Sequence, residues 1–207
     1  MIPRDFRLYL ASRSPRRREL LQQIGIPFEL LALRERAPRG PDVSETVFPG
    51  ESPEAYVRRV CRAKVRAAWT RVRERGLEPQ PVLAADTTVS LGEVLLGKPA
   101  DHEDAVRMLR MLSGTVHRVI TAVAMQFEKR FEMTANESAV RFCVLTEREI
   151  TEYVASGEPM DKAGAYAIQG RAATFIPEMR GSYSGVMGLP LYETAALIDR
   201  IMQGRSA

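Results

Sequence analysis

The run of residues 82–91 most strongly constrains how this chain can fold. Its sequence, Val-Leu-Ala-Ala-Asp-Thr-Thr-Val-Ser-Leu, is rich in residues that favour strands, and it is apolar at both odd and even positions up to Ala85. A strand that is apolar on both faces must be covered on both faces. We therefore predict a central strand, buried on two sides, at this position.

Asp86 interrupts the apolar part of this strand. An ionised carboxylate on a central strand is costly unless it is paired, coordinated to a metal or solvated at a cleft. Structural aspartates of this kind usually cap a turn, but the Thr-Thr-Val-Ser that follows favours a strand. Asp86 is therefore the best single candidate for chemistry.

A second informative stretch begins with a strand expected at residues 6–11, which leads into a helix. Ser14 suits the N-cap, and Pro15 suits the first helical position. The helix should end near Ile24, because Gly25 is a natural left-handed stop.

The start of this helix is a candidate phosphate site. Free backbone N–H groups lie there beside Ser12, Arg16 and Arg17, and arginine forks bind phosphate oxygens in pairs. The alternative is a capped helix with a solvated basic face. Cations are disfavoured in a first turn by the helix dipole, and a bound anion would offset that cost.

Two lysines could join the same site. Gly92-Glu93 predicts a hairpin turn after the central strand, and the returning chain would bring Lys98 near the point where Asp86 emerges. Lys64 lies within the apolar stripe of a predicted helix. Taken alone, Lys64 is more simply explained as a snorkelling side chain whose stem covers apolar surface.

The rest of the chain alternates between strands and helices. We expect long β runs at 115–127 and 130–145, short strands around 174–176 and 183–186, and a last helix at 191–202.

Length and charge narrow the class of protein. The chain has 207 residues, which suits one domain or one domain with two lobes, and its net charge of +4 fits an anionic partner. A nucleic-acid-binding regulator is the competing class, but aromatic residues make up only 7% of the chain, which is few for a stacking surface.

The sequence also indicates the cellular compartment in which we expect the protein. Cys61 and Cys143 have no CxxC spacing and are expected to be free thiols. No apolar run approaches the ~20 residues that a membrane span needs, and the N-terminus lacks a signal-peptide core. We therefore expect a cytoplasmic protein that does not bind membranes.

Short motifs are spread along essentially the whole chain. They are Leu-Ala-Ser-x-Ser-Pro-Arg-Arg-x-Glu-Leu-Leu at 10–21, Gly-Glu-Ser-Pro-Glu-Ala-Tyr-Val at 50–57, Ala-Asp-Thr-Thr-Val at 85–89, Gly-Lys-Pro at 97–99, Leu-Ser-Gly-x-x-His at 112–117, Asp-Lys-Ala-Gly-Ala-Tyr-x-Ile-Gln-Gly at 161–170 and Val-x-Gly-Leu-Pro at 186–190. In this order they resemble the Maf family of nucleoside triphosphate pyrophosphatases.

The resemblance implies an α/β fold shared with inosine-triphosphate pyrophosphatases. A long mixed sheet would form a single domain over residues 1–207, with two lobes around a central cleft. The implied reaction hydrolyses the bond between the α- and β-phosphates of a nucleoside triphosphate, and it needs a divalent cation, Mg²⁺ or Mn²⁺. The resemblance also suggests a homodimer.

The resemblance also implies roles for particular residues. Asp86 would be the catalytic acid, and with Glu45 it would bind the metal. Substrate contacts would come from Ser12, Arg16, Arg17, Lys64 and Lys98. The loop motif departs from the family at Ser44, where an acidic residue is usual, so the assignment of Glu45 rests on its place in the loop expected at 34–50.

The branch of the family is indicated by Arg16, Thr87 and Gln169, which match the branch that acts on dTTP and UTP. The branch that prefers 7-methyl-GTP carries tryptophan in place of Arg16 and glutamine after the catalytic aspartate. Gln169 offers both a donor and an acceptor, which suits a pyrimidine edge, and Thr87 is small enough to leave room beside it. The same chemistry on another base is the alternative.

Overall fold

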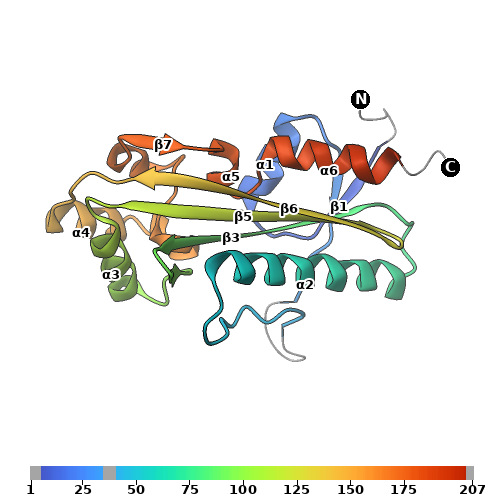
Figure 1. Ribbon diagram of the computed structural model, residues 1–207, viewed down its shortest axis with the longest axis horizontal. Coiled ribbons are helices and arrows are strands. Elements are labelled where there is room, and N and C mark those ends of the chain that lie inside the picture. The colour runs from blue at the N-terminus through green and yellow to red at the C-terminus, as the bar shows by residue number, and fades with distance from the viewer. Residues whose placement is uncertain (1–5, 35–40, 204–207) are drawn as a thin grey trace.

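The computed structural model describes residues 6–34 and 41–203, so part of the expected loop at 34–50 lies outside the described residues. A seven-stranded mixed sheet runs in the order β2-β1-β3-β5-β6-β7, and β4 pairs with β3 (Figure 1). The strands are β1 (Leu8–Leu10), β2 (Phe28–Leu30), β3 (Val82–Leu91), β4 (Val94–Leu96), β5 (Val116–Phe127), β6 (Arg130–Arg141) and β7 (Glu178–Arg180).

Helices cover both faces of the sheet and one of its ends (Figure 1). The α-helices are α1 (Pro15–Gln23), α2 (Pro53–Glu74), α3 (His102–Leu112), α4 (Glu147–Ala155), α5 (Tyr183–Met187) and α6 (Leu191–Gln203). Three short 3₁₀ helices follow α4, namely η1 (Glu158–Asp161), η2 (Ala163–Ala165) and η3 (Arg171–Phe175). Within the described ranges, no helix is both long and apolar enough to cross a bilayer.

The prediction of a central strand at 82–91 is confirmed. Strand β3 lies between β1 and β5, and its first four residues, 82–85, are fully buried. On one face Ala84 packs with residues of α2, and on the other Leu83 packs with residues of α1 and α6. Because side chains alternate along a strand, Asp86 falls on the α2 face and Thr87 on the α1–α6 face.

One edge of β3 is open at this point. Strand β1 pairs with β3 only as far as Leu10 opposite Leu83, and β4 pairs with β3 only from Val89 onward. The opposite edge is filled by β5, where Asp86 lies opposite Ala122. Among the described residues, the stretch 86–88 therefore has no strand neighbour on one side, so side chains on both faces can reach a common space.

The short strands expected at 174–176 and 183–186 were predicted wrongly. Residues 171–175 form η3 and residues 183–187 form α5, and the only strand in this part of the described chain is β7, between them. At α5 the Ser182 hydroxyl accepts a hydrogen bond from the Gly185 N–H at 3.0 Å, which caps the helix start. Capping and tertiary packing override the β propensity of this segment.

His117 packs against Phe142 and Tyr166, which belong to the apolar core that α3, α4 and the 3₁₀ helices form against the sheet. Its Nε2 is 2.8 Å from the Tyr166 hydroxyl, and Phe142 packs edge-on against its ring. The histidine is 1% exposed, and its Nδ1 has no partner. Burial lowers the pKa of His117 to about 4, so the folded protein keeps this ring neutral.

This lowered pKa predicts a pH-dependent stability. Between pH 6.5 and about 4 the unfolded chain binds a proton at His117 that the folded chain does not, so stability falls as pH falls. The loss should reach about 3 kcal/mol near the folded pKa. Urea unfolding at about pH 7 and about pH 5 should show a smaller loss for His117→Gln than for the wild type.

The matched control is His102→Gln, at an exposed position in the first turn of α3. This variant should keep the wild-type loss of stability with falling pH. An equal pH dependence in wild type and His117→Gln would contradict the assignment.

Candidate active site

A cavity of about 640 Å³ opens beside the unpaired stretch of β3. Loops and helices from both faces of the sheet supply its walls. All the side chains singled out in the sequence line it, namely Ser12, Arg16, Arg17, Glu45, Lys64, Asp86, Thr87, Lys98 and Gln169. The structure therefore brings together residues that lie up to 157 positions apart.

A lysine held between two carboxylates forms the α2 side of the cavity. The Lys64 ammonium lies 2.7 Å from Asp86 Oδ1 and 2.6 Å from Glu45 Oε1. Lys64 projects from α2, which packs against β3, and its ammonium reaches Asp86 on that strand.

Lys64 changes the pKa of Asp86 and of Glu45, and both carboxylates change the pKa of Lys64. Burial raises the pKa of Asp86 and outweighs the opposing attraction of Lys64. Burial opposes the charge on Lys64, but its two carboxylate neighbours raise its pKa. For Glu45, burial is likewise overcome, and Lys64, Lys98 and Arg17 lower its pKa.

Asp42 holds in place the loop that carries Glu45. Its carboxylate accepts hydrogen bonds from the backbone N–H and the Nε of Arg34, at 2.6 and 2.9 Å, and it pairs with Arg71 of α2. Arg71 is 8% exposed and also donates to the Ala32 carbonyl at 2.7 Å. The Tyr56 hydroxyl donates to the Glu45 carbonyl at 3.2 Å, which fixes the loop beside α2.

Arg17 enters the cavity from α1, on the opposite face of the sheet. Its Nε donates to the Gly188 carbonyl at 2.8 Å, and its two terminal nitrogens donate to the hydroxyls of Ser12 at 3.3 Å and Thr87 at 3.2 Å. All three acceptors are neutral. Burial lowers the pKa of Arg17, although a guanidinium keeps its charge in proteins.

The cap of α1 differs from the expectation in one detail. Ser14 is the N-cap residue, as predicted, but its side chain makes no capping hydrogen bond. Instead its backbone N–H donates to the Ser12 hydroxyl at 3.2 Å. Ser12 thereby connects the start of the helix to Arg17.

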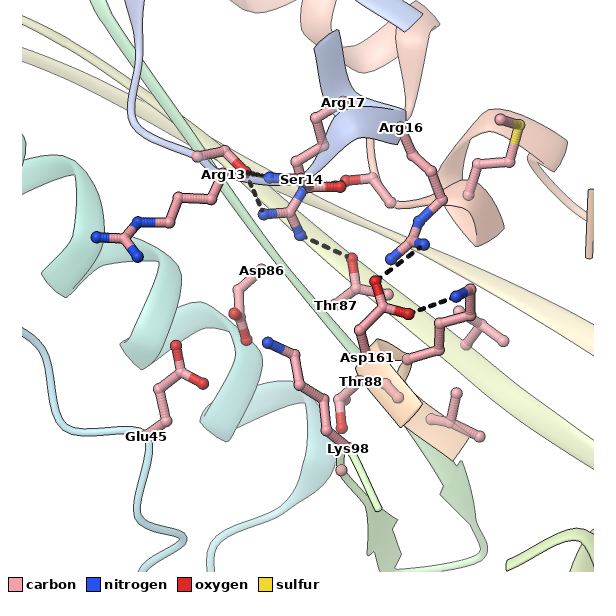
Figure 2. Close-up of a pocket in the computed structure, with 18 of the residues that line it drawn as sticks. Arg13, Ser14, Arg16, Arg17, Glu45, Asp86, Thr87, Thr88, Lys98 and Asp161 are labelled. Carbon is pink, nitrogen blue, oxygen red and sulfur yellow. Dashed lines mark hydrogen bonds and ion pairs between the residues drawn. The ribbon is translucent and has the colours of Figure 1, made fainter. Parts of the chain in front are cut away.

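Arg16 has a counter-ion that the sequence did not indicate. Its guanidinium lies 3.7 Å from the carboxylate of Asp161, at the end of η1, and Asp161 also pairs with Lys162. Figure 2 shows Arg16 and Arg17 approaching from one side of the cavity, with Glu45, Asp86 and Lys98 on the other. The motif at 161–170 was noticed in the sequence, but nothing in it indicated this ion pair.

The donor set around Asp86 fits a divalent cation that binds together with a phosphate ligand. Asp86 and Glu45 supply two carboxylates close to one another, since both contact Lys64. Within the described ranges, no group of three or more His, Cys, Asp or Glu side chains could hold a metal. Mg²⁺ is commonly held by one or two carboxylates and completes its coordination with water and substrate phosphates.

A family model and individual sequence relatives both match nearly the whole chain. Residues 7–201 match the family model described as Maf-like protein. A relative from Aromatoleum aromaticum, named dTTP/UTP pyrophosphatase, is 55% identical over 96% of this chain and 97% of its own length. One from Ralstonia nicotianae with the same name is 56% identical over 92% of each chain. Among solved structures, the Staphylococcus aureus Ham1 protein overlaps 96% of this chain and 99% of its own, with a TM-score of 0.49 and 14% identity.

The ion pair between Lys64 and Asp86 predicts a specific pattern of stability. Lys64→Met leaves the buried Asp86 carboxylate without its ion-pair partner and should lower the free energy of unfolding by about 3 kcal/mol. The double variant Lys64→Met/Asp86→Asn should recover most of that loss, because the uncompensated charge is gone. Urea unfolding near neutral pH would measure each value.

Lys98→Met is the matched control, since Lys98 lines the same cavity but is exposed. It should change stability by less than Lys64→Met. A double variant less stable than Lys64→Met alone would contradict the assignment of the loss to the unpaired carboxylate.

Proposed function

This chain belongs to the family of Maf-like proteins, and we propose from that membership that it hydrolyses the α–β phosphoanhydride bond of dTTP and UTP. The products are the nucleoside monophosphate and pyrophosphate. Support comes from relatives of about the same length that carry this activity in their names. The observation that carries the proposal is the buried carboxylate of Asp86 facing a cavity lined by arginines and lysines.

Four cations would bind the polyphosphate. A triphosphate carries several negative charges, and in a partly enclosed cavity these need fixed positive partners. Arg16 and Arg17 reach the cavity from α1, whereas Lys64 comes from α2 on the opposite face of the sheet. Lys98 lies across the cavity from the two arginines, so the chain of phosphates would be held from more than one side (Figure 2). Ser12 fixes the direction of Arg17.

Asp86 would orient and deprotonate the attacking water. Its raised pKa suits a group that must accept a proton, because the best general bases have a pKa close to the working pH. Together with Glu45, Asp86 would also hold a divalent cation. A bound cation would make the phosphorus more electrophilic and would lower the pKa of a water molecule bound to the cation. Because phosphoryl transfer needs little covalent work from the protein, positioning by these side chains accounts for most of the catalysis.

The base would be recognised by Gln169 and Thr87. Both line the cavity together with Arg16, so the residues that distinguish the dTTP/UTP branch share one space. The amide of Gln169 can donate and accept at once, which matches the alternating groups of a pyrimidine edge. A homodimer and a cytoplasmic location remain predictions.

The test of the function is a panel of nucleoside triphosphates assayed for pyrophosphate, with and without magnesium. UTP and dTTP should give the highest kcat/KM, and a chelator should abolish the release. Release of orthophosphate instead of pyrophosphate would overturn the position of bond cleavage, and a preference for 7-methyl-GTP would overturn the base.

Asp86→Asn should lower kcat by ~10²-fold or more, because the amide cannot accept the proton of the attacking water. Glu93→Gln, at the exposed turn between β3 and β4, is the control for changing an acid on the same hairpin. Pyrophosphate release by Asp86→Asn at nearly the wild-type rate would remove the catalytic role of this residue.

Gln169→Glu should change the ranking of UTP, dTTP and CTP by kcat/KM. A carboxylate only accepts hydrogen bonds, whereas cytosine presents an amino group, so CTP should gain relative to UTP. The ranking is measured with all three nucleotides at matched magnesium. If the order of the three is unchanged, Gln169 does not read the base.

A further inference from the structure

Two side chains hold the two ends of the turn that carries Gln169. The turn runs from Ala167 to Gly170, and the Gly170 N–H closes it by donating to the Ala167 carbonyl at 3.0 Å. This segment lies between η2 and η3 and belongs to neither, so no helix or strand fixes its backbone. Gln169 lines the cavity from this turn, and its direction therefore depends on what holds the turn in place.

Tyr153 of α4 holds the start of the turn. Its hydroxyl accepts a hydrogen bond from the Ala167 N–H at 3.3 Å and donates one to Glu158 Oε1 at 2.8 Å. The tyrosine is 1% exposed, and its ring packs edge-on against Phe175. Because side chains in a close-packed core have few other positions open to them, the Ala167 end of the turn is tied to the core.

Glu158 of η1 holds the end of the turn. Its Oε2 accepts from the N–H of Arg171, the residue that follows Gly170, at 3.1 Å. The carboxylate also lies against Gly170, where an added Cβ would come within 2.1 Å of Oε1. The φ of Gly170 is −103°, which any residue adopts, so a glycine is needed here for the space that the carboxylate takes.

Tyr153 and Glu158 act as one unit, because the tyrosine hydroxyl donates to the glutamate. Neither is among the described residues that line the cavity, so they would influence a ligand only through the turn. We propose that Tyr153 and Glu158 are positioning residues that hold Gln169 where its amide meets the edge of the base. The inference rests on the proposed function and on the role of Gln169 in it.

The experiment compares kcat/KM for UTP and CTP in the wild type and in Tyr153→Phe. Phenylalanine keeps the buried ring but leaves the Ala167 N–H without its acceptor, so the turn can shift and the Gln169 amide can adapt to either base. The UTP/CTP ratio should fall about fivefold, chiefly through a higher KM for UTP, since the groups around Asp86 are unchanged. A variant that only folds less well would lose rate on both nucleotides alike and keep the ratio.

The matched control is Tyr9→Phe. Tyr9 is a buried tyrosine of β1 whose hydroxyl donates to the Glu78 carbonyl at 3.1 Å, and it packs in a different part of the core from Tyr153. Its loss removes a hydrogen bond of the same kind, so this variant should keep the wild-type ratio. A ratio that falls equally in both tyrosine variants would overturn the inference.

Glu158 is tested by two substitutions of different severity. Glu158→Ala removes the acceptor of the Arg171 N–H and should lower the UTP/CTP ratio. Glu158→Gln should keep it, because the amide oxygen can accept from Arg171 while the amide N–H donates to the oxygen of Tyr153. An equal fall in the two variants would overturn the inference. If Tyr153→Phe does not fold, Gly170→Ala decides: the added methyl must displace the Glu158 carboxylate and lower the ratio, and an unchanged ratio would overturn the inference.

A double variant tests whether Tyr153 acts through Gln169. Gln169→Ala alone should lower the UTP/CTP ratio, and adding Tyr153→Phe should lower it no further, because the side chain that the turn positions is already absent. Additive losses would overturn the inference.

The proposed function fails by a different result. If the wild type releases no pyrophosphate from any nucleoside triphosphate, the function is wrong. If it prefers UTP to CTP and Tyr153→Phe keeps that preference, the function stands and the role of Tyr153 and Glu158 is wrong. A wild type that hydrolyses UTP and CTP equally well also overturns the inference, because Gln169 then makes no choice of base that the turn could support.

Discussion

The site depends on β3 extending beyond the end of β1. Strand β1 stops opposite Leu83, and the edge of β3 stays unpaired until β4 begins at Val89. Only in that interval can a buried strand expose side chains from both of its faces to one cavity. Alternation along the strand then sends Asp86 toward α2 and Thr87 toward α1 and α6. The side chains of Asp86 and Thr87 thus lie on opposite faces of the sheet and line the same cavity.

The cations of the site are held in two different ways. Lys64 lies between Glu45 and Asp86, and Arg16 faces Asp161, so these charges have carboxylate partners in the free protein. Within the part of the chain that the structure describes, Arg17 donates to neutral oxygens alone, yet it is the most firmly directed of the three, because each of its nitrogens has an acceptor. Fixing a guanidinium before the ligand arrives removes part of the entropic cost of binding.

Much of the site could be predicted because its residues stand out locally. Asp86 is a charge in an apolar run, and Arg16 follows a proline that starts a helix. What the sequence did not give is the pairing of Arg16 with Asp161 and the role of the Gly188 carbonyl, since both depend on how distant segments meet. The helix at residues 183–187 was missed for the same reason. Gly185 packs closely against Ser182 and against Asn136 of β6, and the local sequence does not show that β6 lies there.

Among the described residues no carboxylate contacts Arg17 directly, so its field reaches the cavity weakened only by the more distant Asp86 and Glu45. Low-dielectric walls concentrate such a field, so any polyanion should be drawn in quickly and with little regard to its base. Under the proposed function, attraction of the nucleotide and selection of its base would then depend on different atoms. The charged groups would attract any nucleotide, and the uncharged ones, Thr87 and Gln169, would decide which of the bound molecules stays long enough to be hydrolysed.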